Sequence, residues 1–151
     1  NLLYYMIIET ILIFVFVILE IIKNIIEKSL PFNYTPFKFT TIGMITLSYF
    51  YSVKTGLILL FFHILIKMIF LRFDDKTLIS IPSLVIILIL ANVLNNFDYV
   101  FIATTLLITR YISDLVLGAI VFNNLNLNKI PGRVINTLIS YGIFSFIGIF
   151  I

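Results

Sequence analysis

The hydrophobic positions of this chain fall into six runs that are separated by short polar stretches. The runs cover residues 2–28, 39–50, 56–71, 78–94, 99–122 and 131 to the end of the sequence. A helix that crosses the hydrocarbon core of a bilayer needs about 20 predominantly apolar residues, and five of the runs are close to that length or exceed it. The run at 39–50 is shorter, which predicts either a thin span or a half-helix.

Composition places the chain among polytopic membrane proteins. Of its 151 residues, 62% are hydrophobic and 11% are charged, whereas a soluble domain is about half apolar and about a quarter charged. We therefore predict an all-α fold, a single integral membrane domain over residues 1–151 built as a bundle of about six transmembrane helices. The expected location is a membrane, with the chain as a multi-pass protein of the cell membrane.

Prolines mark two of the predicted helix boundaries. Pro31 and Pro36 lie in the polar stretch at 29–38, and Pro31 is expected to end the first helix because the residue before a proline disfavours helical geometry. Pro82 is expected in the first turn of the run at 78–94, where a missing backbone N–H is tolerated.

The basic residues between the runs predict an orientation. If all six runs span the bilayer, one side carries seven of these residues and the other carries Lys54 alone. If the run at 39–50 does not span, the residues divide four and four and favour neither side. Cytoplasmic loops are enriched in Lys and Arg, so the first side is expected to be cytoplasmic and both termini to be outside. The seven residues are Lys23, Lys28, Lys38, Arg72, Lys76, Lys129 and Arg133.

Two apolar runs carry charges in their interiors. Arg110 and Asp114 are four residues apart in the run at 99–122 and share one helical face. His63 and Lys67 have the same spacing in the run at 56–71. Both runs are expected to cross in the same direction, so His63 should lie level with Arg110, and Lys67 level with Asp114. Charges at membrane depth usually face a bundle interior, and we therefore expect these two segments to touch.

Small residues support that contact. Gly56 lies on the face of His63 and Lys67, and Gly118 lies on the face of Arg110 and Asp114. Small side chains let two membrane helices approach closely.

The buried charges predict a ligand-binding pocket formed by His63, Lys67, Arg110 and Asp114. An excess of Arg and Lys suits a small anionic or polar solute, and Asp114 would orient the cations. The alternative is a structural ion pair, Asp114 with Arg110 or Lys67, that only fixes helix packing.

The first run carries three glutamates, of which Glu9 is a further candidate ligand residue because it sits about two turns inside the apolar sequence. Glu9, Glu20 and Glu27 are spaced so that they share one face. One interpretation is a stripe of carboxylates that faces the bundle. The alternative, which we expect for Glu20 and Glu27, is solvation at the interface beside Lys23 and Lys28, with only Glu9 inside the apolar sequence.

The last run begins with a second polar group. Arg133, Asn136 and Ser140 share a helical face just after Pro131, which is typical of a helix start. The alternative function is contact of Arg133 and Asn136 with a partner protein or an anionic lipid.

The sequence contains no catalytic motif that would predict an enzyme. The sequence lacks the H-E-x-x-H, G-x-S-x-G and P-loop patterns. With no Cys and one His, neither a metal site nor any other cofactor is predicted. A basic patch with interleaved aromatics is absent as well, so nucleic acid is not an expected partner.

The layout of the six runs resembles the substrate-binding S components of energy-coupling-factor transporters, and it is also similar to MreD-like membrane proteins. The resemblance lies in the entry to the third run, Tyr51-Ser52-Val53-Lys54-Thr55-Gly56, and in Pro131-Gly132-Arg133 before the last. It implies a solute-binding or transport subunit that works with other membrane subunits. The chain departs from S components in its shorter length, in its Ile, Phe and Val first helix without a small-residue face, and in its predicted orientation. The alternative is a structural or assembly subunit with no ligand of its own.

Overall fold

The computed structural model of the protein describes residues 2–29, 38–123 and 127–150, and its regular structure there is entirely helical. The helices are α1 (Leu2–Ser29), α2 (Phe39–Phe50), α3 (Val53–Ile69), α4 (Asp75–Val93), α5 (Tyr99–Phe122), a short 3-10 turn η1 (Leu127–Lys129) and α6 (Ile130–Phe150). The predicted all-α bundle is confirmed within this part of the chain. Pro31 and Pro36 lie outside the described residues.

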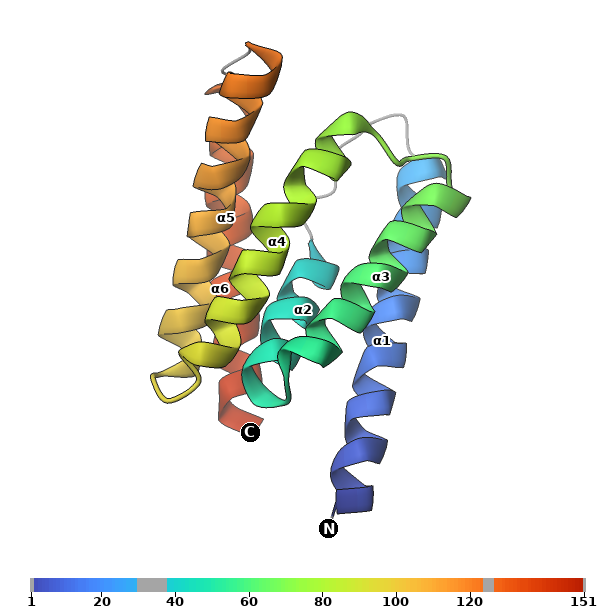
Figure 1. Ribbon diagram of the computed structural model, residues 1–151, viewed down its shortest axis with the longest axis vertical. Coiled ribbons are helices and arrows are strands. Elements are labelled where there is room, and N and C mark those ends of the chain that lie inside the picture. The colour runs from blue at the N-terminus through green and yellow to red at the C-terminus, as the bar shows by residue number, and fades with distance from the viewer. Residues whose placement is uncertain (1, 30–37, 124–126, 151) are drawn as a thin grey trace.

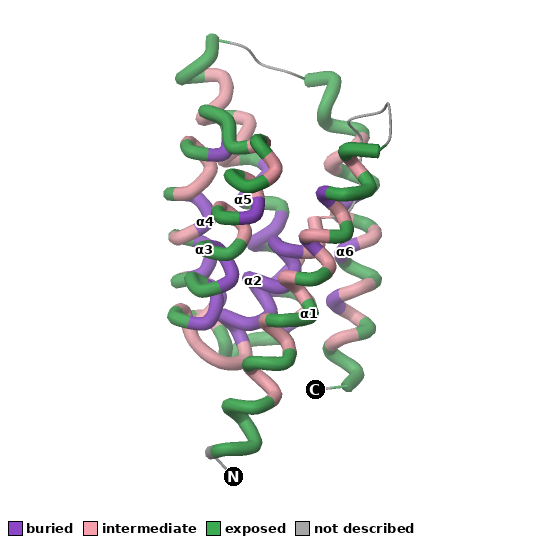
Figure 2. Tube along the Cα trace, turned by 90° about the vertical axis from the view of Figure 1, so that its right-hand side faces the viewer, coloured by how far each residue is buried: buried purple, intermediate pink, exposed green. Residues whose placement is uncertain are grey.

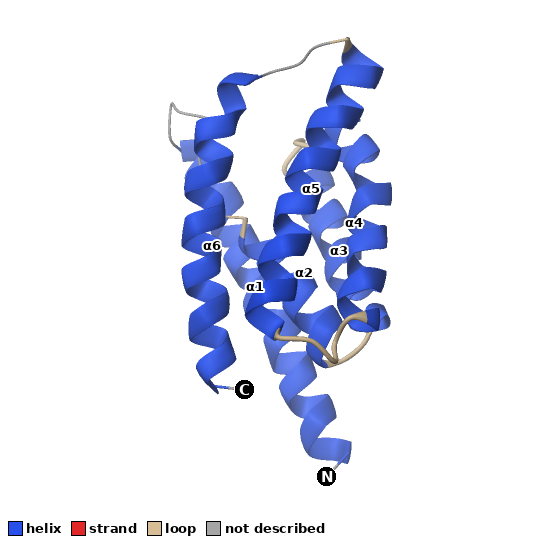
Figure 3. Ribbon diagram, turned by 90° about the vertical axis from the view of Figure 1, so that its left-hand side faces the viewer, coloured by secondary structure: helices blue, strands red, loops and turns tan. Residues whose placement is uncertain are grey.

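Successive helices run in alternating directions along the bundle (Figure 1). The two ends of the chain therefore lie at the same end of the molecule, and the turn between α3 and α4 lies at the opposite end (Figures 1 and 3). Lys54 begins α3 near the termini, whereas Arg72 and Lys76 flank the far turn. This alternation is the arrangement on which the predicted orientation depends.

Four of the described helices are long and apolar enough to cross a membrane, as expected of an integral membrane protein. They are α1, α4, α5 and the continuous segment of η1 and α6. α2 has 12 residues, which is about 18 Å of helix and well short of a hydrocarbon core of about 30 Å. The two interpretations of the run at 39–50 therefore resolve in favour of the half-length helix.

Polar side chains begin three of the helices at the predicted breaks. The Ser52 hydroxyl accepts a hydrogen bond from the Thr55 amide at the start of α3, and the Asp98 carboxylate accepts one from Phe101 at the start of α5. Asp74 caps α4 in the same way. Because α4 begins at Asp75, Pro82 lies inside the helix and not in its first turn as predicted.

α2 lies at the centre of the bundle and packs against α1, α3, α4 and α5 (Figure 2). All ten residues from Thr40 to Tyr49 are buried. Ile42, Ile45 and Tyr49 join a core cluster with α4, α5 and α6. Met44 and Leu47 join a second cluster with α3, α4 and α1. The short helix is therefore the common core element of both halves of the bundle.

Glycines permit two of these close contacts. A Cβ at Gly43 would lie 2.5–2.8 Å from atoms of the Phe16 ring of α1, and a Cβ at Gly56 would lie 2.2 Å from the Ser48 hydroxyl. Gly56 therefore serves close packing, but against α2 and α4 instead of α5. Gly118 has nothing within 4 Å of its Cβ position, so its predicted role in a helix contact is wrong.

Candidate functional site

A cavity of about 580 Å³ opens between α4, α5 and α6, at the point where α2 begins and α3 ends. Six cationic side chains and two carboxylates line it, an excess of four positive charges. The cations are Lys38, Lys67, Lys76, Arg110, Lys129 and Arg133, and the carboxylates are Asp74 and Asp114. Three of the four residues predicted to form a pocket are therefore among its lining residues, and His63 is not.

Arg110 is the most deeply buried of these cations, with 6% of its surface exposed. Its Nη1 donates a hydrogen bond to the Thr41 hydroxyl in the first turn of α2. Its Nε lies 3.9 Å from Oδ2 of Asp114, one turn further along α5. The shared face predicted for Arg110 and Asp114 is thus directed into the bundle, where both residues line the cavity.

Lys67 does not pair with Asp114. The predicted packing of α3 against α5 is also wrong. α2 and α4 each pack against both α3 and α5 and separate them. Lys67 turns instead to the start of α4, where its Nζ donates to the Thr77 hydroxyl at 2.9 Å. That hydroxyl donates in turn to Oδ1 of Asp74 at 2.6 Å.

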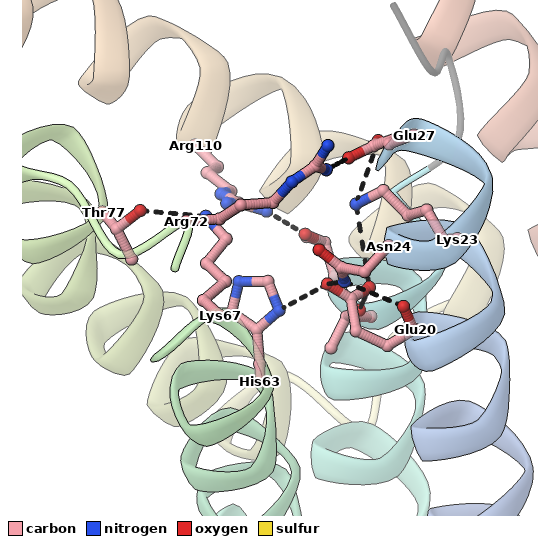
Figure 4. A network of polar contacts seen from close by, with 11 residues as sticks. Glu20, Lys23, Asn24, Glu27, His63, Lys67, Arg72, Thr77 and Arg110 are labelled. Atoms are coloured by element: carbon pink, nitrogen blue, oxygen red, sulfur yellow. Dashed lines mark hydrogen bonds and ion pairs between the residues drawn. The ribbon is translucent and has the colours of Figure 1, made fainter. Parts of the chain in front are cut away.

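His63 joins a second polar cluster, between α1, α2 and α3 (Figure 4). Its Nδ1 lies 3.0 Å from Oε1 of Glu20. The same carboxylate accepts hydrogen bonds from the Thr40 hydroxyl and, at 3.2 Å, from Nδ2 of Asn24. Lys23 lies 3.7 Å from its other oxygen. Glu20 is only 1% exposed, so its predicted solvation is wrong.

Glu20 is the important residue that the sequence prediction assigned to the wrong environment. The signal was the common face of Glu9, Glu20 and Glu27, because each of them bonds to α3 or to the turn that follows it. Glu9 accepts from the Thr55 hydroxyl, and Glu27 pairs with Arg72 beyond the end of α3. The glutamate face of α1 is therefore a polar seam along α3.

Glu9 lies in this seam and not in the cavity. It is eleven residues before Glu20 in α1, a separation of about 16 Å along the helix. Its partner Thr55 is in the first turn of α3, toward the termini. Glu9 therefore takes no part in the group formed by Arg110 and Asp114.

Two adjacent residues of α2 connect the cavity with the polar seam. Thr41 accepts a hydrogen bond from Arg110 on the α5 side, and Thr40 donates one to Glu20 on the α1 side. The first turn of α2 therefore lies between the two charged clusters, and a movement of this turn would affect both.

The ring of Tyr111, in the wall of the cavity, is close to two cations. The Lys38 ammonium is 4.8 Å from the ring centre, and the Arg133 guanidinium is 5.7 Å from it, which are distances of cation–π contacts. Arg133 also donates to the Tyr111 carbonyl at 2.8 Å. The pKa of Lys38 is lowered to about 7, mainly because the ammonium group is buried and secondly because the positive charge of Arg110 is close.

The contacts of Arg133 and Asn136 lie inside the bundle. Arg133 is directed to α5, as its contacts with Tyr111 show. Asn136 is buried, and its Oδ1 accepts a hydrogen bond from Ser140 at 3.1 Å. Both residues line the cavity, and contact with a lipid or a partner protein stays a prediction.

No protein-family model matches the chain, and neither a curated protein nor a solved structure matches it.

Proposed function

We propose that this protein binds a small solute with an anionic group in the cavity between α4, α5 and α6, as a solute-binding or transport subunit of a complex in the cell membrane. The observation that carries the proposal is Arg110, a buried guanidinium in the wall of a cavity with an excess of positive charge.

Charge is the first argument. Like charges repel strongly where water is scarce, and six cationic side chains but only two carboxylates line the cavity. Lys76 and Lys129 are exposed, so the repulsion falls mainly on the four cations that are buried or partly buried. An anion in the cavity would relieve that repulsion. Guanidinium groups are suited to the task because they bind carboxylates and phosphates through two parallel hydrogen bonds.

Size is the second argument. Small-molecule sites usually enclose about 300–1,000 Å³, and the cavity has about 580 Å³. Part of its wall is apolar and comes from Ile79, Leu115, Leu117 and Phe122. A solute with an anionic group and an apolar body would match this lining.

The role as a subunit follows from the resemblance to S components of energy-coupling-factor transporters, which stays a prediction. Many apolar side chains of α1 and α5 are exposed, which is compatible with contact either to lipid or to other membrane subunits. Purification in mild detergent with mass spectrometry of the bound proteins would test for such subunits.

The binding proposal is tested by Arg110→Gln in purified protein, with Lys54→Gln as the matched control. Lys54 is an exposed cation at the opposite end of the bundle and does not line the cavity. We expect Arg110→Gln to remove binding of small carboxylates, measured by calorimetry, while the protein still accumulates in the membrane. If carboxylates do not bind the unaltered protein and Arg110→Gln only prevents accumulation, Arg110 has a structural role and the chain is better described as an assembly subunit.

A further inference from the structure

Three polar groups of α5 residues that line the cavity are buried without a hydrogen-bond partner among the described residues. They are Nε of Arg110, the hydroxyl of Tyr111 and Oδ1 of Asp114, and all three residues line the cavity. The Ser48 hydroxyl is the one further buried group of this kind in the described chain, and it lies against α3 at Gly56. Three of the four unpaired groups in the described chain therefore belong to residues that line the cavity.

Such a concentration is informative because proteins rarely leave buried polar groups unpaired. Each one typically costs about 1–3 kcal/mol. Arg110 and Asp114 also fail to satisfy each other, since their nearest atoms are 3.9 Å apart and make an ion pair but no hydrogen bond. The three atoms themselves are closed to solvent, but their residues line the cavity, so a bound solute would pair with them once these side chains turn toward it.

The chemistry of the three groups specifies what the solute must offer. Nε–H of Arg110 needs an acceptor, and a negative one is best. Oδ1 of Asp114 needs a donor, since an ionised carboxylate only accepts. A solute with an anionic group alone would satisfy Arg110 but would bring a second negative charge close to Asp114.

We infer that the solute carries a hydrogen-bond donor a few ångströms from its anionic group, as α-hydroxy acids and amino acids do. The inference rests on the proposed function and narrows it, from anionic solutes in general to those that combine the two groups. The anionic group binds Arg110, the donor binds Asp114, and the Tyr111 hydroxyl can donate or accept beside them. The rest of the solute occupies the remainder of the cavity.

The smallest probes of this idea are acetate, glycolate and glycine. They share a carboxylate, and they carry on the neighbouring carbon no donor, a hydroxyl and an ammonium group respectively. The chain has three arginines, Arg72, Arg110 and Arg133, so protein labelled with ¹⁵N-arginine gives three Nε–H signals by NMR. Arg110→Lys identifies the signal of interest, and Arg72, which does not line the cavity, is the internal reference.

We expect glycolate and glycine to shift the Arg110 signal at concentrations at least about tenfold lower than acetate, the effect of one added hydrogen bond to a charged group. In Asp114→Asn, the advantage of glycine over acetate should fall several-fold. Equal half-points for the three probes in the unaltered protein would overturn the inference and leave anion binding intact. No shift with any probe would count against the proposed function itself.

Discussion

Glu20 of α1 and His63 of α3 are joined by a hydrogen bond inside the bundle, with 3.0 Å between Oε1 and Nδ1. The carboxylate is also bonded to Thr40 of α2. One glutamate thus joins three helices. The same seam continues on either side through Glu9 with Thr55 and Glu27 with Arg72. α1, whose other faces are largely apolar and exposed, is held to the bundle by a row of charged and polar contacts.

We predict that Glu20→Ala destabilises the protein by about 1–3 kcal/mol, because it leaves His63, Thr40 and Asn24 without their shared acceptor. Glu9→Ala is the matched control, since Glu9 is partly exposed and bonds to one hydroxyl only. The measurement is the fraction of monodisperse protein that survives heating in detergent. Equal losses for the two variants would show that Glu20 has no special role in joining the helices.

Two glycine substitutions should have opposite effects on stability. Gly43→Ala places a methyl group within 2.8 Å of the Phe16 ring, and overpacking of this kind typically costs about 1–3 kcal/mol. Gly118→Ala meets nothing within 4 Å and should be neutral or stabilising by up to about 1 kcal/mol, because alanine favours a helix. The same heating assay distinguishes the two. A Gly118→Ala variant less stable than Gly43→Ala would contradict this packing.

Solute binding should depend on pH through Lys38, whose pKa is lowered to about 7 by burial and by Arg110. Below that pH Lys38 is a cation in the cavity wall, and above it the side chain is neutral. Affinity for an anionic solute should therefore fall by roughly three- to tenfold as the pH rises from about 6 to about 8. Calorimetry at the two pH values provides the measurement.

Lys38→Arg is the control for this titration, because arginine stays charged over the whole range. Its affinity should be nearly constant between the two pH values. The charges that act on Lys38 most strongly are those of Arg110, Asp114 and Arg133. An unchanged pH dependence in Lys38→Arg would assign the effect to another group.

The predicted orientation can be tested with single cysteines, since the chain has none of its own. Lys54 and Lys76 are both exposed and begin helices at opposite ends of the bundle. A membrane-impermeant maleimide should label Lys54→Cys in intact cells, and Lys76→Cys only after permeabilisation. The reverse pattern would place the termini and Lys54 on the cytoplasmic side.

The helices were predictable because the residues next to each boundary determine where the helix begins and ends. The runs at 39–50 and 99–122 coincide with α2 and α5, since Lys38 and Ser52 border the first run and the capping residue Asp98 and Asn123 border the second. The start of α4 was placed three residues late, because Asp75, Lys76 and Thr77 look like a loop in composition although Asp74 caps them as a helical turn. That error also put Pro82 in the wrong turn.

The site was predictable only in part, because spacing fixes which residues share a face but not which helix that face meets. Arg110 and Asp114 were correctly placed together on the inner face of α5. Lys67 was assigned to Asp114 on the assumption that α3 and α5 touch, whereas the central position of α2 directs Lys67 to Thr77. Glu20 was taken for an interfacial residue because its partners come from two other helices, Thr40 and His63.

The burial of α2 from Thr40 to Tyr49 has a consequence for how the chain tolerates mutation. A helix in contact with lipid can exchange one apolar residue for another of different size, because lipid tails adapt to its surface. α2 is surrounded by protein, so side-chain volume should constrain it more than polarity does; Thr40, Thr41, Thr46 and Ser48 are already among its buried residues. In a complete substitution scan, the shortest helix should be the one least tolerant of changes in size.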